Sequence, residues 1–192
     1  GMVALAFAER YRCSGTRLVI ISASASPHPM ATAARSLQRK MVGLGLEHGC
    51  AARALEIARG MAMLGYRTRS EFGARFARGI LGDDPCGPSE PLAYLEARGR
   101  AFAETMAPGR FLSLSASIDR HRVDPAKISA PSLVIGASSA QLVFPEDLRR
   151  LADEISADAE VHILDTLFGH DMFLKESIRV GQIIEPFLTA RA

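Results

Sequence analysis

The sequence has few cysteines, a nearly balanced charge and no long hydrophobic run. Its three cysteines, Cys13, Cys50 and Cys86, are far apart and odd in number, so they fit reduced thiols better than a disulfide framework or a zinc site. A formal net charge of +2 is too small to favour nucleic acid. No apolar run reaches the roughly 20 residues of a membrane helix, and no basic segment precedes an apolar one near residue 1. We therefore expect a cytoplasmic protein with no export signal, no membrane or nucleic-acid partner and no metal site.

The 192 residues fit one globular domain, since 48% are hydrophobic and 23% are charged. Three short apolar runs are typical of buried strands: residues 16–22 (TRLVIIS), 132–136 (SLVIG) and 160–164 (EVHIL). Three other segments have helical periodicity: residues 2–11, 145–155 and 173–188. Because strands and helices alternate after residue 124, the pattern predicts an α/β protein with parallel βαβ architecture.

The middle of the chain, from about residue 29 to residue 119, has a helical pattern. Its first apolar face recurs at steps of three and four, in Met30, Ala34, Leu37, Met41 and Leu44. Residues 68–71 (TRSE) form a capping box that begins another helix, and residues 83–89 are typical of a loop. We predict a helical region over residues 28–123, inserted into an α/β core made of residues 1–27 and 124–192.

Four segments in the same order resemble the homoserine O-acyltransferase family. They are residues 1–5 (GMVAL), 26–33 (SPHPMATA), 133–136 (LVIG) and 169–174 (GHDMFL). The resemblance implies a partial α/β-hydrolase fold, with the last three parallel strands of the family's sheet and a large helical lid. It also implies transfer of an acetyl or succinyl group from acyl-CoA to the hydroxyl of homoserine or serine, as in methionine biosynthesis. Acyl-CoA is a co-substrate there, and we expect no bound cofactor.

The same resemblance assigns four site residues. His170 falls on the family's general base, and Asp171 falls on the carboxylate that holds the substrate amine. Arg59 and Tyr66 fall on a lid arginine and tyrosine that line the substrate site. Seven residues are two helical turns, so the last two side chains share a helix face. A guanidinium can give a substrate carboxylate two parallel hydrogen bonds.

Two members of the family's Ser-His-Asp triad do not match. By the elbow spacing the serine is expected about four residues before Met2, which precedes this chain. The orienting acid is expected about four residues after Gly136, where Ala140 stands instead. Loss of one triad member typically costs on the order of 10⁴ to 10⁶ in rate, so we expect the chain as given to be inactive. Four residues are considered as replacements for the missing groups but are more typical of surface or capping positions: Ser138, Ser139, Asp147 and Asp165.

Other interpretations of the sequence stay open. The chain is a truncated acyltransferase, a non-catalytic remnant that acts in binding or assembly, or a lidded hydrolase of other specificity. Without the resemblance, His170 is better explained as a structural histidine. For Arg59 and Tyr66, a helix-surface charge and a core tyrosine are an equally good interpretation. Because the resemblance implies only the last three strands of the family's sheet, the strand at residues 17–22 would have one bare edge. We therefore expect a homodimer, formed through the lid helices or through that edge, or docking with a separate N-terminal half.

Overall fold

The chain divides into two compact units in a computed structural model that describes residues 1–11, 16–76, 87 and 89–190. The first, called here the sheet unit, comprises Gly1–His28 and Arg120–Ala192. The second, the helical unit, comprises Pro29–Asp119. Most of the loop predicted at residues 83–89, together with Cys13 and Cys86, lies outside the described residues.

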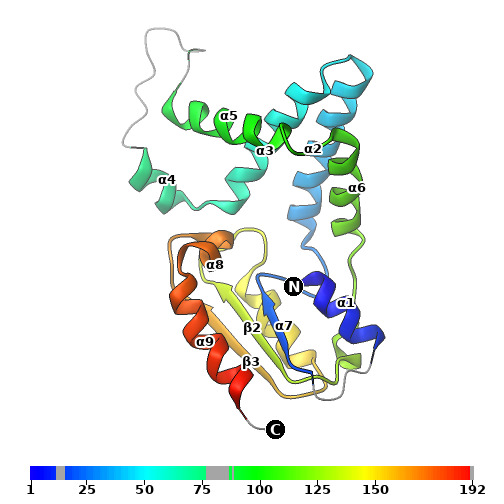
Figure 1. Ribbon diagram of the computed structural model, residues 1–192, viewed down its shortest axis with the longest axis vertical. Helices are drawn as coiled ribbons and strands as arrows, with labels where there is room; N and C mark the ends of the chain where they lie inside the picture. The colour runs from blue at the N-terminus through cyan, green and yellow to red at the C-terminus, as the bar shows by residue number, and fades with distance from the viewer. Residues whose placement is uncertain (12–15, 77–86, 88, 191–192) are drawn as a thin grey trace. The chain divides into compact units, whose positions relative to one another are not determined.

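The sheet unit is built on three parallel strands, β1 (Leu18–Ile21), β2 (Ser132–Ala137) and β3 (Ala159–Leu164), in the order β1-β2-β3 (Figure 1). Leu18 is in register with Ser132, and Ser132 is in register with Ala159. The predicted α/β class with a parallel sheet is confirmed. Within the described part of the chain β1 pairs with β2 alone, and its residues Val19 and Ile21 are only partly buried.

Alternation along the strands sends side chains to two hydrophobic layers. Ile20 and Val134 point to one layer, which also contains residues of α1 (Met2–Arg10) and α7 (Pro145–Glu154). Leu133 and Ile135 point to the other layer, which contains Met172 of α8 (Met172–Lys175) and residues of α9 (Ser177–Thr189). All six residues of β2 are buried because helices cover both of its faces. A short 3₁₀ helix, η1 (Pro125–Lys127), leads into β2.

The single helix predicted over residues 173–188 is wrong, because Glu176 separates α8 from α9. Its φ of −116° and ψ of 42° are not helical. The Glu176 carboxylate accepts a hydrogen bond from the Thr166 hydroxyl and pairs with Arg179 at 3.0 Å. These contacts favour a break that the apolar spacing did not indicate. At the other end of α9, Arg17 donates to the carbonyls of Phe187 (2.9 Å) and Ala190 (2.7 Å), where a cation is favourable.

The helical unit contains five helices among its described residues: α2 (Pro29–Glu47), α3 (Ala51–Tyr66), α4 (Arg69–Arg75), α5 (Glu90–Ala103) and α6 (Pro108–Asp119). Val42, Leu55 and Ala58 form its buried centre, with partly buried aromatic residues packed around them. Helices α3 and α5 approach closely at Gly99, where a Cβ atom would lie 2.4 Å from the Glu56 carbonyl oxygen. Such a contact leaves room for glycine alone.

The face predicted for the first helix of this unit is largely wrong, although Met41 packs against the buried centre. Met30, Leu37 and Leu44 are 69%, 58% and 58% exposed. The buried positions of α2 are Ala31, Gln38, Val42 and Gly45. Close packing against α3 explains the difference, since small residues let two helices approach: a Cβ at Gly45 would meet the Ala54 Cβ at 2.4 Å.

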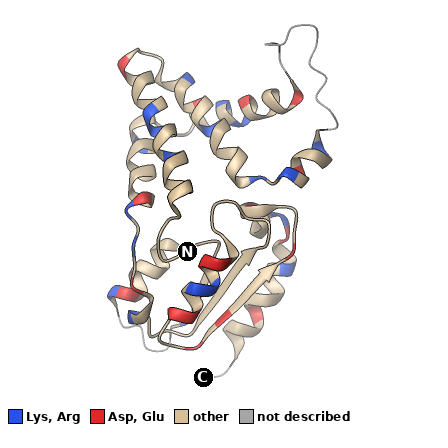
Figure 2. Cartoon of the chain, turned by 180° about the vertical axis from the view of Figure 1, so that it is seen from behind, with Lys and Arg blue, Asp and Glu red and all other residues tan. Residues whose placement is uncertain are grey.

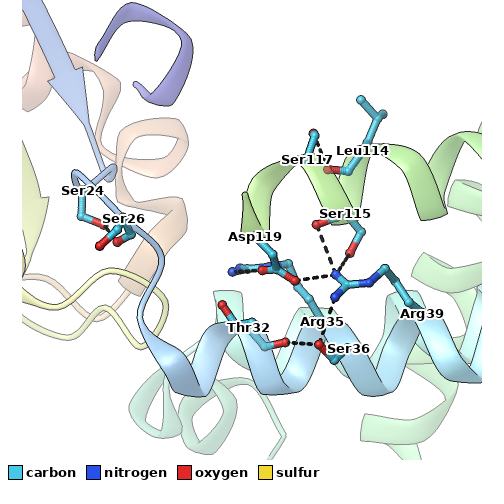
Figure 3. Close-up of polar contacts among 10 residues, drawn as sticks. All are labelled: Ser24, Ser26, Thr32, Arg35, Ser36, Arg39, Leu114, Ser115, Ser117 and Asp119. Atoms are coloured by element: carbon cyan, nitrogen blue, oxygen red, sulfur yellow. Dashed lines mark hydrogen bonds and ion pairs between the residues drawn. The ribbon is translucent and has the colours of Figure 1, made fainter. Parts of the chain in front are cut away.

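Polar contacts join α2 to α6 at one end of the helical unit (Figure 3). The Asp119 carboxylate is 2.6 Å from both Arg35 and Arg39, and Arg39 also donates to the Ser115 hydroxyl at 2.9 Å. Asp119 is only 10% exposed at its side chain. The predicted cap at Thr68 is confirmed, because its hydroxyl accepts from the Glu71 amide at 3.1 Å.

Charge is mixed in sign on the described surface (Figure 2). Helix α7 carries both signs along its length, and Arg150 pairs there with Asp147 at 2.6 Å. A search of the described helices finds none that is long and apolar enough to cross a membrane.

Candidate functional site

The candidate site lies at the carboxyl edge of the sheet. Because the three strands are parallel, the segments that follow them emerge at the same edge. Ser22 follows β1, Ser138 to Ala140 follow β2, and a turn that contains His170 follows β3. This edge is where ligands bind in open parallel sheets.

His170 is presented by a tight turn, the 3₁₀ helix η2 (Gly169–Asp171). Gly169 has a φ of +55°, in the left-handed region that favours glycine. The His170 side chain is partly exposed, but its Nδ1 atom is buried. Burial lowers the pKa of His170, against the opposing effect of the Asp171 charge. The imidazole is therefore neutral at neutral pH and able to accept a proton.

A serine hydroxyl ties the His170 turn to the loop after β2. Ser139 Oγ donates to the Thr166 carbonyl at 2.5 Å and accepts from the Gly169 amide at 3.3 Å. One side chain thus bonds to two backbone groups that precede His170, one in Thr166 and one in Gly169.

A second polar layer supports this turn from α9. The Thr166 hydroxyl donates to the Glu176 carboxylate and accepts from the Phe168 amide at 3.2 Å. Arg179 pairs with Glu176 and donates to the Asp165 carbonyl, each at 3.0 Å. The Thr166 hydrogen bond, followed by Arg179, lowers the pKa of Glu176 below its ordinary value. The carboxylate is therefore ionised at neutral pH.

Ala140 occupies a buried place beside this turn. It is 6% exposed and belongs to the same hydrophobic cluster as Leu164 and Met172, which flank the turn in sequence. Of the nearby acids considered as replacements, Asp165 accepts from the Ser138 hydroxyl at 3.1 Å, and Asp147 pairs with Arg150 in the first turn of α7. Both carboxylates thus have partners other than His170.

Arg59 and Tyr66 lie together on α3 in the helical unit. The Arg59 guanidinium is 5.1 Å from the centroid of the Tyr66 ring and 5.0 Å from that of Phe102. Both distances are within the range of cation–π attraction. The aromatic rings hold the guanidinium in a defined position. A cation–π contact does not use its N–H groups, which can therefore donate to a carboxylate.

Sequence reasoning missed two serines of the sheet edge. Ser22 has a φ of +48°, which is uncommon for a residue with a side chain, and its buried hydroxyl has no hydrogen-bond partner among the residues that the structure describes. Ser139 was considered only as a replacement nucleophile, and its role as a bridge depends on the fold of two separate loops. No local signal in the sequence identifies either property.

A cavity of about 520 Å³ lies elsewhere in the sheet unit. Glu9, Ser24, Arg122 and Glu154 are among its lining residues, whereas none of the predicted site residues lines it. In the described ranges, no three His, Cys, Asp or Glu residues are grouped in a way that could hold a metal ion.

Comparison with known proteins gives a consistent relationship. Homoserine O-succinyltransferase of Xanthomonas campestris pv. campestris is 36% identical over 189 residues, which are 95% of this chain and 50% of that protein. The chain is homologous to homoserine O-acyltransferases. Serine O-succinyltransferase of Litchfieldella anticariensis is 28% identical over 98% of the chain and 59% of its own length. No protein-family model matches the sequence.

The solved structures agree on the fold. Homoserine O-acetyltransferase from Bacillus anthracis superposes with a TM-score of 0.90 over 99% of this chain and 57% of its own chain, at 12% sequence identity. An identity this low shows the fold alone, which is that of α/β hydrolases. The chain spans about half the length of the curated relatives it matches.

Proposed function

We propose that His170 is the general base of an O-acyltransferase site. The observation that carries the proposal is a half-buried, neutral histidine in a braced turn at the carboxyl edge of a parallel sheet. A neutral imidazole is the form that accepts a proton from a hydroxyl. Homology to homoserine O-acyltransferases supports the reaction class.

In the transfer step, the acceptor's hydroxyl oxygen bonds to the acyl carbon while His170 takes the hydroxyl proton. His170 then returns the proton to the leaving group as the bond between that group and the acyl carbon breaks. The leaving atom is the oxygen of an acylated serine in the family's mechanism, and the sulfur of CoA where the acyl group passes directly from acyl-CoA. Acyl-CoA is the donor in this scheme, and homoserine or serine is the acceptor, in keeping with the names of the relatives. By the resemblance, Asp171 binds the amine of the acceptor, and Arg59 with Tyr66 binds its carboxylate.

We further propose that the chain as it stands transfers acyl groups poorly. Ala140 has no carboxylate to orient the imidazole or to stabilise its protonated form. In related triads such a loss costs on the order of 10⁴ in rate. No serine of the 192 residues is assigned as the acyl carrier.

A second candidate function is binding without catalysis, and the alanine at position 140 favours it. An amino-acid site can persist after its catalytic acid is lost, because Arg59, Tyr66 and Asp171 do not depend on that acid for their own chemistry. The two candidates differ in turnover but share the ligand.

The test is calorimetric titration of the chain with homoserine, alongside release of free CoA from acetyl-CoA or succinyl-CoA. We expect homoserine binding that Arg59→Ala abolishes and Arg100→Ala leaves unchanged, since Arg100 is an arginine of the same unit that is 54% exposed. Binding without CoA release supports the non-catalytic candidate. Absence of homoserine binding to the unaltered chain contradicts both candidates.

For assembly, we propose a homodimer formed through the helical unit. Helices α3 and α5 frame an apolar hollow of about 160 Å³, and Ile57, Leu64 and Leu92 at this hollow are 46%, 51% and 43% exposed. At its rim, Arg53 pairs with Glu96 at 3.0 Å. A rim with both charges is self-complementary, as a two-fold interface requires.

Light scattering at micromolar concentration tests the assembly. We expect a dimer mass that falls to the monomer value in Leu64→Glu. Leu114→Glu is the matched control on α6, because Leu114 is 50% exposed and does not line the hollow. A monomer mass for the unaltered chain, or a dimer that persists in Leu64→Glu, contradicts this interface.

A further inference from the structure

The loop after β2 carries a side chain whose only described partners are the backbone groups of the His170 turn. Ser139 Oγ donates to the Thr166 carbonyl at 2.5 Å and accepts from the Gly169 amide at 3.3 Å. The hydroxyl therefore spans the segment that begins four residues before His170 and ends one residue before it. Both groups are backbone, so the bridge fixes the path of the chain and not one side-chain rotamer.

One of the two groups that Ser139 bonds belongs to Gly169, a residue without a side chain. Gly169 adopts a φ of +55° and has no side chain to pack, and its amide donates to the Ser139 hydroxyl in the β2 loop. Thr166 is also bonded to the start of α9, because its hydroxyl donates to Glu176 and Glu176 pairs with Arg179. Ser139 is thus the described side chain that joins this segment to the loop after β2.

The residue next to Ser139 in the sequence, Ala140, explains why this bridge is important for His170. Ala140 is buried where the resemblance expects an orienting acid, and alanine cannot bond to an imidazole. A histidine that acts as a base needs a fixed position to reach its proton. A backbone brace can supply that position without contacting the ring.

We propose that Ser139 is a positioning residue for His170, which holds the turn that presents the imidazole by bridging the Thr166 carbonyl and the Gly169 amide. The inference rests on the proposed role of His170 as general base. In this proposal the Ser139 hydroxyl performs part of the task of an orienting acid. A carboxylate at position 140 would hold the imidazole by bonding to its ring, whereas Ser139 holds the backbone that carries the ring.

The experiment follows His170 itself and needs no catalytic activity. The His170 imidazole is titrated by NMR in the full chain, its rate of modification by diethyl pyrocarbonate is measured by mass spectrometry, and exchange of the Gly169 amide is recorded. In Ser139→Ala we expect a rise of the His170 pKa toward 6.5, since a looser turn hydrates the ring. We also expect faster modification and about tenfold faster exchange of the Gly169 amide.

Two variants separate positioning from general stability. Ser139→Thr keeps the hydroxyl, so we expect it to restore the behaviour of the unaltered chain. Ser138→Ala is the matched control, because the neighbouring hydroxyl donates to the Asp165 carboxylate at 3.1 Å and not to the turn. We expect it to leave His170 unchanged. Ser139→Cys, a weak hydrogen bonder of similar size, gives the same test if the alanine variant does not fold.

The proposal is overturned if Ser139→Ala and Ser139→Cys leave the His170 pKa and modification rate unchanged. It is also overturned if Ser138→Ala shifts them equally, or if Ser139→Thr fails to restore them. These results are distinct from a failure of the proposed function, which appears as absent homoserine binding whatever residue stands at position 139.

Discussion

The sheet unit and the helical unit are stabilised in different ways. In the sheet unit, aliphatic side chains fill two layers, and every residue of β2 is buried. In the helical unit, the buried apolar cluster among the described residues consists of Val42, Leu55 and Ala58, with partly buried apolar side chains packed around it. The unit also contains ion pairs that are largely buried. Arg67 and Glu71, for example, pair at 3.1 Å with side chains only 10% exposed. The comparison indicates that two aliphatic layers dominate the first unit, whereas the second combines a smaller apolar centre with close glycine contacts and largely buried ion pairs.

The largest expected effect is on the sheet core. Leu133 of β2 is fully buried, so Leu133→Ala should lower the free energy of unfolding by about 2–5 kcal/mol. Leu174→Ala, at a position that is 64% exposed, should change it by less than about 0.5 kcal/mol. Urea unfolding measures both. Equal effects for the two variants would contradict the burial that the strand pattern implies.

Next is the ion cluster of the helical unit. Asp119→Ala leaves Arg35 and Arg39 without their shared carboxylate, which should cost about 1.5–3 kcal/mol. Hydrogen exchange should speed up in α2 and α6 and stay unchanged in β2. The matched exposed pair is Arg150–Asp147, where Arg150→Ala should cost no more than about 1 kcal/mol because Arg150 is 63% exposed. Exchange that changes only in the sheet unit would refute the proposed role of the cluster.

Two glycine substitutions in the helical unit should change the free energy of unfolding by smaller amounts and in opposite directions. Gly99→Ala places a methyl group against the Glu56 backbone and should destabilise by about 1–3 kcal/mol. Gly43→Ala meets nothing within 4 Å, so it should stabilise through helix propensity by about 0.5–1 kcal/mol. Thermal unfolding of the two variants distinguishes them. A shift of the same sign in both would show that α3 and α5 do not approach closely.

The smallest effect concerns pH and belongs to the sheet unit. Burial lowers the pKa of both His170 and His121 in the folded chain. Below about pH 6.5, the unfolded state therefore binds protons that the folded state does not, and stability falls with pH until the folded pKa values are reached. Urea titrations between pH 7 and pH 5 should show this slope. His170→Gln should reduce it, and an unchanged slope would count against burial of the imidazole.

The sequence predicted the sheet more accurately than the helical unit. The run at 132–136 became β2, which is buried on both faces as continuous aliphatics predict, and the run at 160–164 became β3, which is only partly buried. The exposed stripe of Met30, Leu37 and Leu44 was mistaken for a core face, since periodicity cannot tell which apolar face is buried. The break at Glu176 was missed because Thr166, its partner, lies ten residues away.

Only part of the candidate site could be predicted from the sequence. The Gly-His-Asp turn was found from its motif, and the structure places it at the carboxyl edge of β3 as a 3₁₀ turn. Helical spacing predicted that Arg59 and Tyr66 share a helix face, and the cation–π contact between them was not predicted. The bridge from Ser139 was not accessible, because it joins two loops that are distant in sequence and brought together by strand pairing.

The most direct test of the central claim is an NMR titration of His170 in Ala140→Asp and Ala140→Asn. If position 140 is the acid position of an acyl-transfer site, the aspartate lies beside the imidazole. Its charge then stabilises the protonated ring, so the His170 pKa rises in Ala140→Asp above its value in the neutral Ala140→Asn control. Identical titrations in the two variants would contradict the assignment of His170 as the base of that site.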